Sequence, residues 1–229
     1  MKTKSEELFE QFLTDNSVTF EKIKEDATPP AKPGSHEAAS PVDMRVGHHR
    51  PDYLVSVGSV RVIFELKELA EDENFGVVKD PKYPHIISSS RTVGDHVRRR
   101  IESSKKQIQF GAKQGILSVL LIYTDVDPVF QMFGTEQMDF ITAMYGAYTI
   151  LLNKQTMASS EIFHGKDRML QAKKNTSFSA VGHLCDRGGT TTVTLFENVF
   201  AKVKVPRGQL PPCFDVPNVE VSTEPLILP

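Results

Sequence analysis

The segment 50–69, RPDYLVSVGSVRVIFELKEL, constrains the fold of this 229-residue chain more than any other stretch. Two runs rich in Val, Ile, Phe and Tyr flank Gly58-Ser59, as expected for two β-strands joined by a tight turn. A two-residue loop that begins with Gly favours a type II′ hairpin turn. If these two residues form the loop, Val57 pairs with Val60 and the rest of the register follows.

Three charged residues interrupt the apolar pattern of this hairpin. In the predicted register Asp52 lies opposite Glu65, with their Cβ atoms about 5 Å apart. Because side chains alternate along a strand, Lys67 points to the same face as Glu65. The expected core face holds Tyr53, Val55, Val57, Val60, Val62, Phe64 and Leu66. The expected opposite face holds Asp52, Leu54, Ser56, Arg61, Ile63, Glu65 and Lys67.

The cost of facing carboxylates suggests a chemical role for this end of the hairpin. Like charges directly opposite each other are destabilising, and more so when they are partly buried. Paired carboxylate oxygens suit a hard cation such as Mg²⁺ or Mn²⁺, and a nearby lysine can orient or deprotonate a water. The alternative is a solvated hairpin end where Lys67 pairs with Glu65 and Glu68. The register, the apolar flanks and the helix that follows favour the metal site.

The rest of the chain predicts an α/β fold. Residues 3–14 have the pattern of an amphipathic helix that starts with a Thr3/Glu6 capping box. A strand is expected at 17–23, a flexible loop near 25–46, and a long polar connection at 69–95 that resembles a flap beside a site. One helix is expected over 96–113, with Val97, Ile101, Ser104, Ile108 and Ala112 toward the core. A buried central strand follows at 115–125.

Beyond residue 128 the sequence is β-rich. A helix is expected at 135–145 and strands at 148–152, 177–184 and 190–196, followed by an extended arm from residue 206. We therefore expect a central mixed sheet flanked by helices, within one domain of residues 1–229. Its core would be 3–124, with a C-terminal β-rich extension at 128–229.

Composition limits the classes of function. The net charge of −2 gives no global basic field, so any contact with nucleic acid needs a local patch. Cys185 and Cys213 are too few for a disulfide framework and lack metal-site spacing. The first residues lack a signal-peptide core and no stretch reaches membrane-spanning length, so we expect a cytoplasmic protein with no membrane partner.

The residues of the hairpin resemble the PD-(D/E)xK nuclease superfamily, which has the restriction-endonuclease-like fold. The resemblance lies in Pro51-Asp52 at the start of one strand and in Glu65-Leu66-Lys67 in the next. The order of elements also fits, with an acidic helix, the sheet strands, a helix rich in Lys and Gln, and a buried strand. The match covers roughly residues 3–124, and no motif of the superfamily is visible after Pro128.

The resemblance implies roles for individual residues. Asp52 and Glu65 would be metal ligands together with the Leu66 carbonyl, and Lys67 would be the catalytic lysine. Members often add a metal-binding Glu from the first helix, and among Glu6, Glu7 and Glu10 we prefer Glu6 for this role. An equally good reading is that Glu6 only stabilises the N-terminus of its helix. Many members also place a Gln or Lys of the second core helix in the site. Gln107 is the candidate, with a solvated helix position as its alternative.

Basic side chains on the same predicted helix are candidates for contact with the phosphate backbone, and a solvated helix face is an equally good reading of them. They are Arg98, Arg99, Arg100, Lys105 and Lys106. His48 and His49 precede the motif and are weighed as metal or phosphate ligands against partly exposed residues that precede a strand.

The resulting hypothesis is a Mg²⁺- or Mn²⁺-dependent nuclease that hydrolyses nucleic acid, DNA rather than RNA by resemblance. A second copy of the chain is a further conceivable partner. The alternative is a catalytically inactive module of the same fold that binds nucleic acid or a protein.

Overall fold

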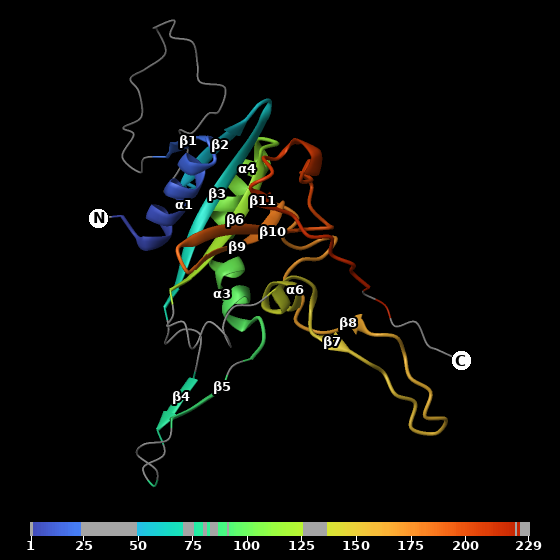
Figure 1. Ribbon diagram of the computed structural model, residues 1–229. Helices are drawn as coiled ribbons and strands as arrows, with labels where there is room; N and C mark the ends of the chain where they lie inside the picture. Colours follow the sequence, from blue (N-terminus) through green and yellow to red (C-terminus); the bar gives the residue numbers. More distant parts are fainter. Residues whose placement is uncertain are drawn as a thin grey trace, which may run out of the picture.

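A seven-stranded mixed β-sheet forms the centre of the molecule, in the order β1-β2-β3-β6-β9-β10-β11 (Figure 1). The computed structural model describes residues 2–23, 50–70, 76–79, 82, 87–90, 92–125, 137–222 and 224. The strands of the sheet are β1 (Thr19–Lys22), β2 (Tyr53–Val57), β3 (Val60–Ala70), β6 (Leu117–Asp125), β9 (Ala180–Arg187), β10 (Thr190–Glu197) and β11 (Phe214–Asp215). The predicted α/β class with a mixed sheet flanked by helices is confirmed.

The hairpin register predicted from Gly58-Ser59 is confirmed over β2 and β3. Val57 pairs with Val60, and the antiparallel pairs continue without a slip to Tyr53 and Phe64. The predicted core face of the hairpin belongs to one large apolar cluster. The opposite face is also covered, because Leu54 and Ile63 are buried in a smaller cluster under a helix.

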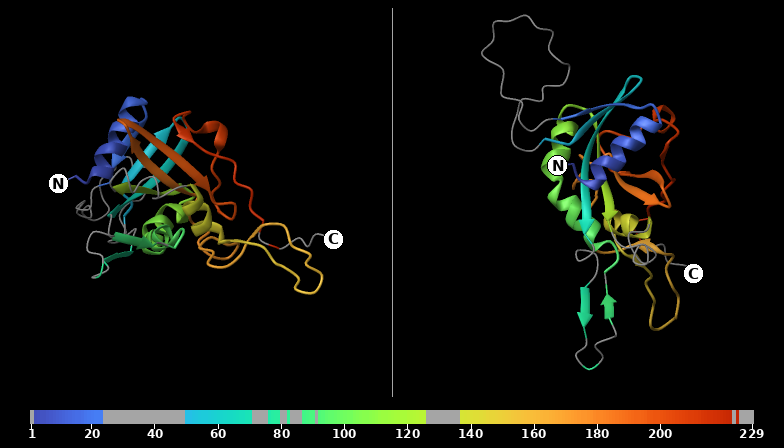
Figure 2. Two further views of the ribbon diagram at one scale, coloured as in Figure 1. Left: turned by 60° about the horizontal axis from the view of Figure 1, so that its bottom comes forward. Right: turned by 60° about the vertical axis from the view of Figure 1, so that its left-hand side comes forward.

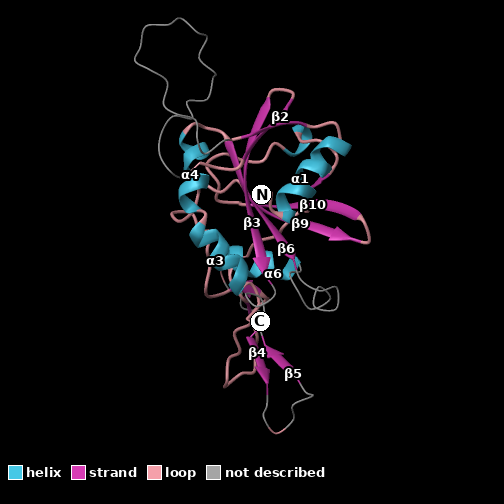
Figure 3. Cartoon of the chain, turned by 90° about the vertical axis from the view of Figure 1, so that its left-hand side faces the viewer, coloured by secondary structure: helices cyan, strands magenta, loops and turns pink. Residues whose placement is uncertain are grey.

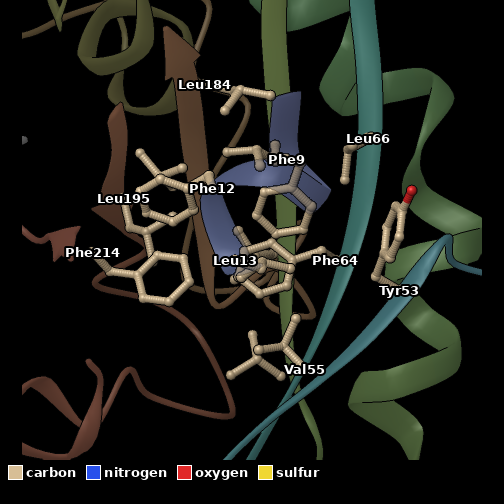
Figure 4. Packing of buried hydrophobic residues seen from close by; sticks show 14 of the residues in the cluster. Phe9, Phe12, Leu13, Tyr53, Val55, Phe64, Leu66, Leu184, Leu195 and Phe214 are labelled. Carbon is tan, nitrogen blue, oxygen red and sulfur yellow. The ribbon is translucent and has the colours of Figure 1, made fainter. Parts of the chain in front are cut away.

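The first helix, α1 (Lys4–Asp15), packs on one side of the sheet against β1, β3, β9 and β10. Its predicted capping box is confirmed, since the Thr3 side chain accepts from the Glu6 N–H while the Glu6 carboxylate accepts from the Thr3 N–H. Figure 4 shows the aromatic core that α1 makes with both ends of the sheet. In it Phe9 packs on Phe64 with ring centroids 4.9 Å apart, and Phe12 packs on Phe214 at 5.5 Å.

Three helices cover the other side of the sheet: α3 (Asp95–Ser103), α4 (Lys105–Lys113) and α6 (Gln137–Tyr145). Figure 3 shows α1 and the pair α3–α4 on opposite sides of β3. Their buried side chains join those of β6 and β9 in a second apolar cluster. The helix predicted at 135–145 is confirmed over the described residues 137–145.

The single helix predicted over 96–113 is wrong in one respect, because it breaks at Ser104. Ser104 has φ −94° and ψ 3°, and the Ser103 hydroxyl bonds back to the Arg100 carbonyl, which is a contact that bends helices. After the break Gly111 faces the sheet instead of the predicted Ala112. A Cβ atom at Gly111 would lie 2.7 Å from Ile63 Cδ1, so α4 packs close against β3.

The predicted central strand is confirmed as β6, which runs parallel to both β3 and β9. The predicted C-terminal strands at 177–184 and 190–196 correspond to β9 and β10. They continue the central sheet, so this part of the chain is not an extension added to a finished core. The arm predicted from residue 206 contains a 3-10 helix (Arg207–Gln209) and β11, which pairs in parallel with β10.

Two small hairpins project from the body in Figure 1. One is formed by β4 (Gly76–Lys79) and β5 (Ile87–Ser90), inside the connection predicted at 69–95. The other is formed by β7 (Tyr148–Thr149) and β8 (Phe163–His164), which replaces the longer strand predicted at 148–152. The flexible loop expected near 25–46 lies outside the described residues.

Candidate functional site

Asp52 departs from the predicted ladder at the open end of the β2–β3 hairpin. The backbone pairing ends at Tyr53 and Phe64, and the Asp52 N–H donates to the Phe64 carbonyl at 3.1 Å. Its carboxylate turns toward β3, where Oδ2 accepts from the Leu66 N–H at 2.7 Å. The expected ladder pair Asp52–Glu65 is therefore wrong, because the aspartate side chain replaces a backbone acceptor at this point.

Glu65 is the most unusual charged residue of the site, since only 2% of it is exposed. Its Oε1 forms an ion pair with Lys67 Nζ at 2.7 Å. Its Oε2 is buried and has no hydrogen-bond partner among the residues that the structure describes. A buried carboxylate oxygen without a partner is costly in a folded protein, and a cation bound there would offset that cost.

The electrostatics show that the two carboxylates lie close enough to interact. Burial raises the pKa of Glu65 to about 7, the charge of Asp52 adds to this, and Lys67 opposes it. Burial also raises the pKa of Asp52, against the lowering effects of the Leu66 N–H and of Lys67. Burial therefore shifts both carboxyls toward the protonated form relative to exposed ones, and a further positive charge would oppose this shift.

The strand β3 explains why these charges meet in an apolar setting. Ile63, Glu65, Lys67 and Leu69 follow one another on the face under α3 and α4. Ile63 belongs to the cluster beneath α4, whereas Leu69 belongs to the larger cluster beneath α3 and α6. The glutamate and lysine lie between the two clusters, and Lys67 remains 29% exposed at its side chain, so the site opens to solvent there.

The donor set fits a hard divalent cation in part. Glu65 Oε2 has no partner, and Asp52 retains Oδ1 beyond the oxygen that Leu66 uses. Among the residues that the structure describes, no three His, Cys, Asp or Glu side chains are grouped to hold a metal. Two protein carboxylates with backbone, water or substrate oxygens are the usual way that Mg²⁺ is bound.

Glu6 forms structural contacts at the start of α1, and its charge also acts on Asp52. Beyond its role in the capping box, Glu6 Oε1 pairs with Lys22 Nζ at 2.6 Å. Both charges act on Asp52, since Glu6 raises the pKa of that carboxyl and Lys22 lowers it, each less than burial does. Glu7 is exposed, and Glu10 accepts a hydrogen bond from the buried Tyr53 hydroxyl at 2.8 Å. The role of Glu6 as a metal ligand stays a prediction.

Gln107 is half-buried on α4, the helix that covers the same face of β3. No described residue is hydrogen-bonded to its side-chain amide. A place in the site is compatible with this position and remains a prediction.

The five basic residues predicted to bind nucleic acid have different environments. Arg98 is used within the fold, since its guanidinium donates to the carbonyls of Val93, Thr142 and Asp167. Lys105 pairs with Glu102 at 2.5 Å, and Arg99 approaches Asp95 at 3.8 Å. Arg100 is half-buried, while Arg99 and Lys106 are exposed. His48 and His49 lie outside the described residues.

Two residues that support the site were not predicted from the sequence. Glu68 accepts from the Ser5 N–H at 2.5 Å, which ties the first turn of α1 to the residue after Lys67. Lys22 places a second cation beside Asp52. The Glu68 contact joins positions far apart in the chain and leaves no sequence signal. Lys22 lies in the strand predicted at 17–23, but its pairing with Tyr53, which brings it close to Asp52, is set by the register of β1 and β2 and is known only from the structure.

No family model, no curated protein and no solved structure matches this chain. Within the described residues no helix is long and apolar enough to span a bilayer.

The raised pKa of Glu65 predicts a pH-dependent stability in the absence of metal. The folded carboxyl, with a pKa of about 7, binds its proton more tightly than the unfolded one near 4.3. The Glu65 contribution to the free energy of unfolding is therefore full below about pH 4, and on the order of 2–3 kcal/mol of it is lost as pH rises to about 7. Glu65→Gln should remove this loss. Urea unfolding in EDTA at pH 5 and pH 8 measures it, and equal pH dependence in both proteins would contradict it.

Proposed function

We propose that this chain is a metal-dependent nuclease of the PD-(D/E)xK type that hydrolyses phosphodiester bonds, in DNA rather than RNA by resemblance. The observation that carries the proposal is the buried Glu65 carboxylate, which has one unpartnered oxygen, a paired lysine and a neighbouring aspartate. A neutral side chain would fill this position at a lower cost.

The topology around the site supports the same proposal. The sequence of α1, three antiparallel strands, helices and a parallel β6 agrees with the order that the resemblance implies for a restriction-endonuclease-like core. Asp52 precedes the second strand, and Glu65 and Lys67 lie in the third, which is next to the central β6.

Each residue has a definite task in this proposal. Asp52 and Glu65 would hold Mg²⁺ or Mn²⁺, which when bound lowers the pKa of a water and neutralises charge on a phosphoryl oxygen. Asp52 is kept in place by the Leu66 N–H. Lys67, partly exposed beside Glu65, would position a water for in-line attack on phosphorus and stabilise the charge that develops there. The P–O bond opposite the water then breaks.

Calorimetric titration with Mn²⁺ tests the metal site. We expect binding to strengthen by up to about tenfold per pH unit between pH 6 and 7 and to level off above, because Glu65 must lose its proton. Asp52→Asn and Glu65→Gln should abolish binding. Glu21→Gln, at an exposed glutamate of β1, is the matched control that should bind as the wild type does.

A cleavage assay tests the activity itself. Single-stranded, double-stranded and branched DNA and RNA are incubated with the protein and Mn²⁺, and we expect cleavage of at least one DNA substrate. Metal binding without cleavage of any substrate would contradict the nuclease. No metal binding and no cleavage would favour the alternative, a module of the same fold that binds nucleic acid or a protein.

A further inference from the structure

The hairpin of β7 and β8 and its connecting loop, residues 147–165, form an arm that projects from the body in Figures 1 and 2. Nine large apolar side chains are exposed among the described residues, and six of them are in this arm. They are Tyr148 (51% exposed), Ile150 (56%), Leu151 (47%), Leu152 (56%), Met157 (67%) and Ile162 (59%). Such a concentration marks a surface for interaction.

The arm is held in shape by its own hydrogen bonds. Asn153 organises the tip, since its Oδ1 accepts from the N–H groups of Gln155 and Thr156 and its N–H donates to the Ala158 carbonyl at 2.8 Å. Ser160 closes the middle of the arm, where its N–H donates to the Leu151 carbonyl and its Oγ accepts from the Leu151 N–H. A two-stranded ribbon that is apolar on its surface is only marginally stable alone in water, so a third strand or a packing partner would stabilise it.

One edge of the arm is free to accept such a strand. The backbone groups of residues 149, 151 and 153 point into the arm, so those of Tyr148, Ile150 and Leu152 point outward along the segment 148–152, which begins with β7. No described residue is hydrogen-bonded to these outward groups. The edge of β8 is different, because the His164 N–H donates to the Ser222 carbonyl at 2.7 Å.

We propose that two copies of this chain associate through their arms, by antiparallel pairing of the free edges at 148–152 about a two-fold axis at Ile150. Three alternate residues centred on Ile150 make the edge self-complementary, since Ile150 meets the partner's Ile150 and Tyr148 meets the partner's Leu152. Side chains at alternate positions share a face, so Tyr148, Ile150 and Leu152 form one apolar stripe across the axis. The two arms then make a four-stranded sheet.

Charge and self-complementarity favour a second copy over other occupants. Lys154 and Glu161 are the only charged residues from 148 to 164, so the arm is neutral and offers no field to nucleic acid or to an acidic partner. The three side chains of the stripe, Tyr148, Ile150 and Leu152, are each about half exposed, at 51%, 56% and 56%. Because a stable interface buries about 800 Å² per partner, we expect this small interface to give a weak dimer whose population depends on concentration.

A charge-swap experiment tests this pairing by sedimentation velocity over a range of micromolar concentrations. Wild-type protein should dimerise, whereas Ile150→Lys and Ile150→Glu should each weaken dimerisation by about tenfold or more, because like charges then meet at the axis. An equimolar mixture of the two variants should restore the dimer. Leu151→Lys, on the opposite face of the strand, is the matched control and should dimerise as the wild type does.

Residue-resolved amide exchange of the wild-type protein gives a test that needs no variant. The amides of Ile150 and Leu152 should gain protection as concentration rises, while that of Leu151 should not change. A monomer at all concentrations, dimerisation unaffected by both charges, or no recovery in the mixture would each overturn the proposal. So would a monomer in which the Ile150 variants lose affinity for DNA, which would assign the arm to nucleic acid. None of these outcomes depends on metal binding or cleavage.

Discussion

Lys67→Ala should reduce Mn²⁺-dependent cleavage by about 10²- to 10⁴-fold, as expected when a group that orients or deprotonates a nucleophilic water is removed. Lys67 is the cation paired with the buried Glu65, at 2.7 Å, and its side chain is 29% exposed, so it lies between that carboxylate and solvent. The alanine variant should still fold and bind nucleic acid, because the methylene groups of Lys67 lie at the margin of the core. Single-turnover rates at saturating Mn²⁺ measure the loss.

The control for this variant removes a comparable ion pair away from the site. Arg207 donates to the Glu197 carboxylate at 2.5 Å and is partly exposed at the far end of the sheet. Arg207→Ala should cleave at the wild-type rate. Cleavage by Lys67→Ala at the wild-type rate would show that Lys67 has no catalytic task, and equal losses in both variants would point to damage to the fold.

Gly94→Ala should lower the free energy of unfolding by about 3 kcal/mol, because the added methyl group would overlap backbone atoms of a neighbouring helix. Gly94 precedes α3 with φ +77°, and its N–H donates to the buried Asp139 carboxylate at 2.7 Å. A Cβ atom there would lie 2.8 Å from the Asp139 carbonyl oxygen and 2.9 Å from the Ala143 nitrogen. Because both contacts are to the backbone of α6, the two helices would have to separate.

Gly115 provides a matched control with the same backbone conformation and no close contact. It has φ +71°, and a Cβ atom would meet nothing within 4 Å. Gly115→Ala should therefore cost only about 1 kcal/mol, which is the penalty of the left-handed conformation itself. Urea unfolding of both variants separates the two effects, and equal losses would mean that the contact between α3 and α6 relaxes without cost.

Local patterns predicted most of the fold because local interactions dictate those parts. The Gly58-Ser59 turn and the alternation beside it fixed the register of β2 and β3, and the capping box fixed the start of α1. The continuous apolar run 116–122 marked the strand buried between two parallel neighbours. The face of β3 that carries Glu65 and Lys67 followed from that register.

The missed features depend on contacts between distant residues. The helix breaks at Ser104, so that each of its two segments packs on the twisted sheet. The regular spacing of apolar residues in the sequence does not show such a break. Asp52 leaves the ladder because its carboxylate competes with a backbone acceptor. The two-residue strands β8 and β11 have no period of their own and exist through their partners.

The parallel pairing of β6 with β3 and β9 also has a consequence for how the chain is made. The β2–β3 hairpin can form as soon as it is synthesised, but the other edge of β3 stays unpaired until the chain has passed through α3 and α4 and reached β6. The other edge of β6 in turn stays unpaired until β9 has been synthesised. Nascent chains therefore carry an exposed apolar strand edge through much of translation, which is a state that invites aggregation and slows folding. We expect yields of the recombinant protein to improve when translation is slowed by cooling.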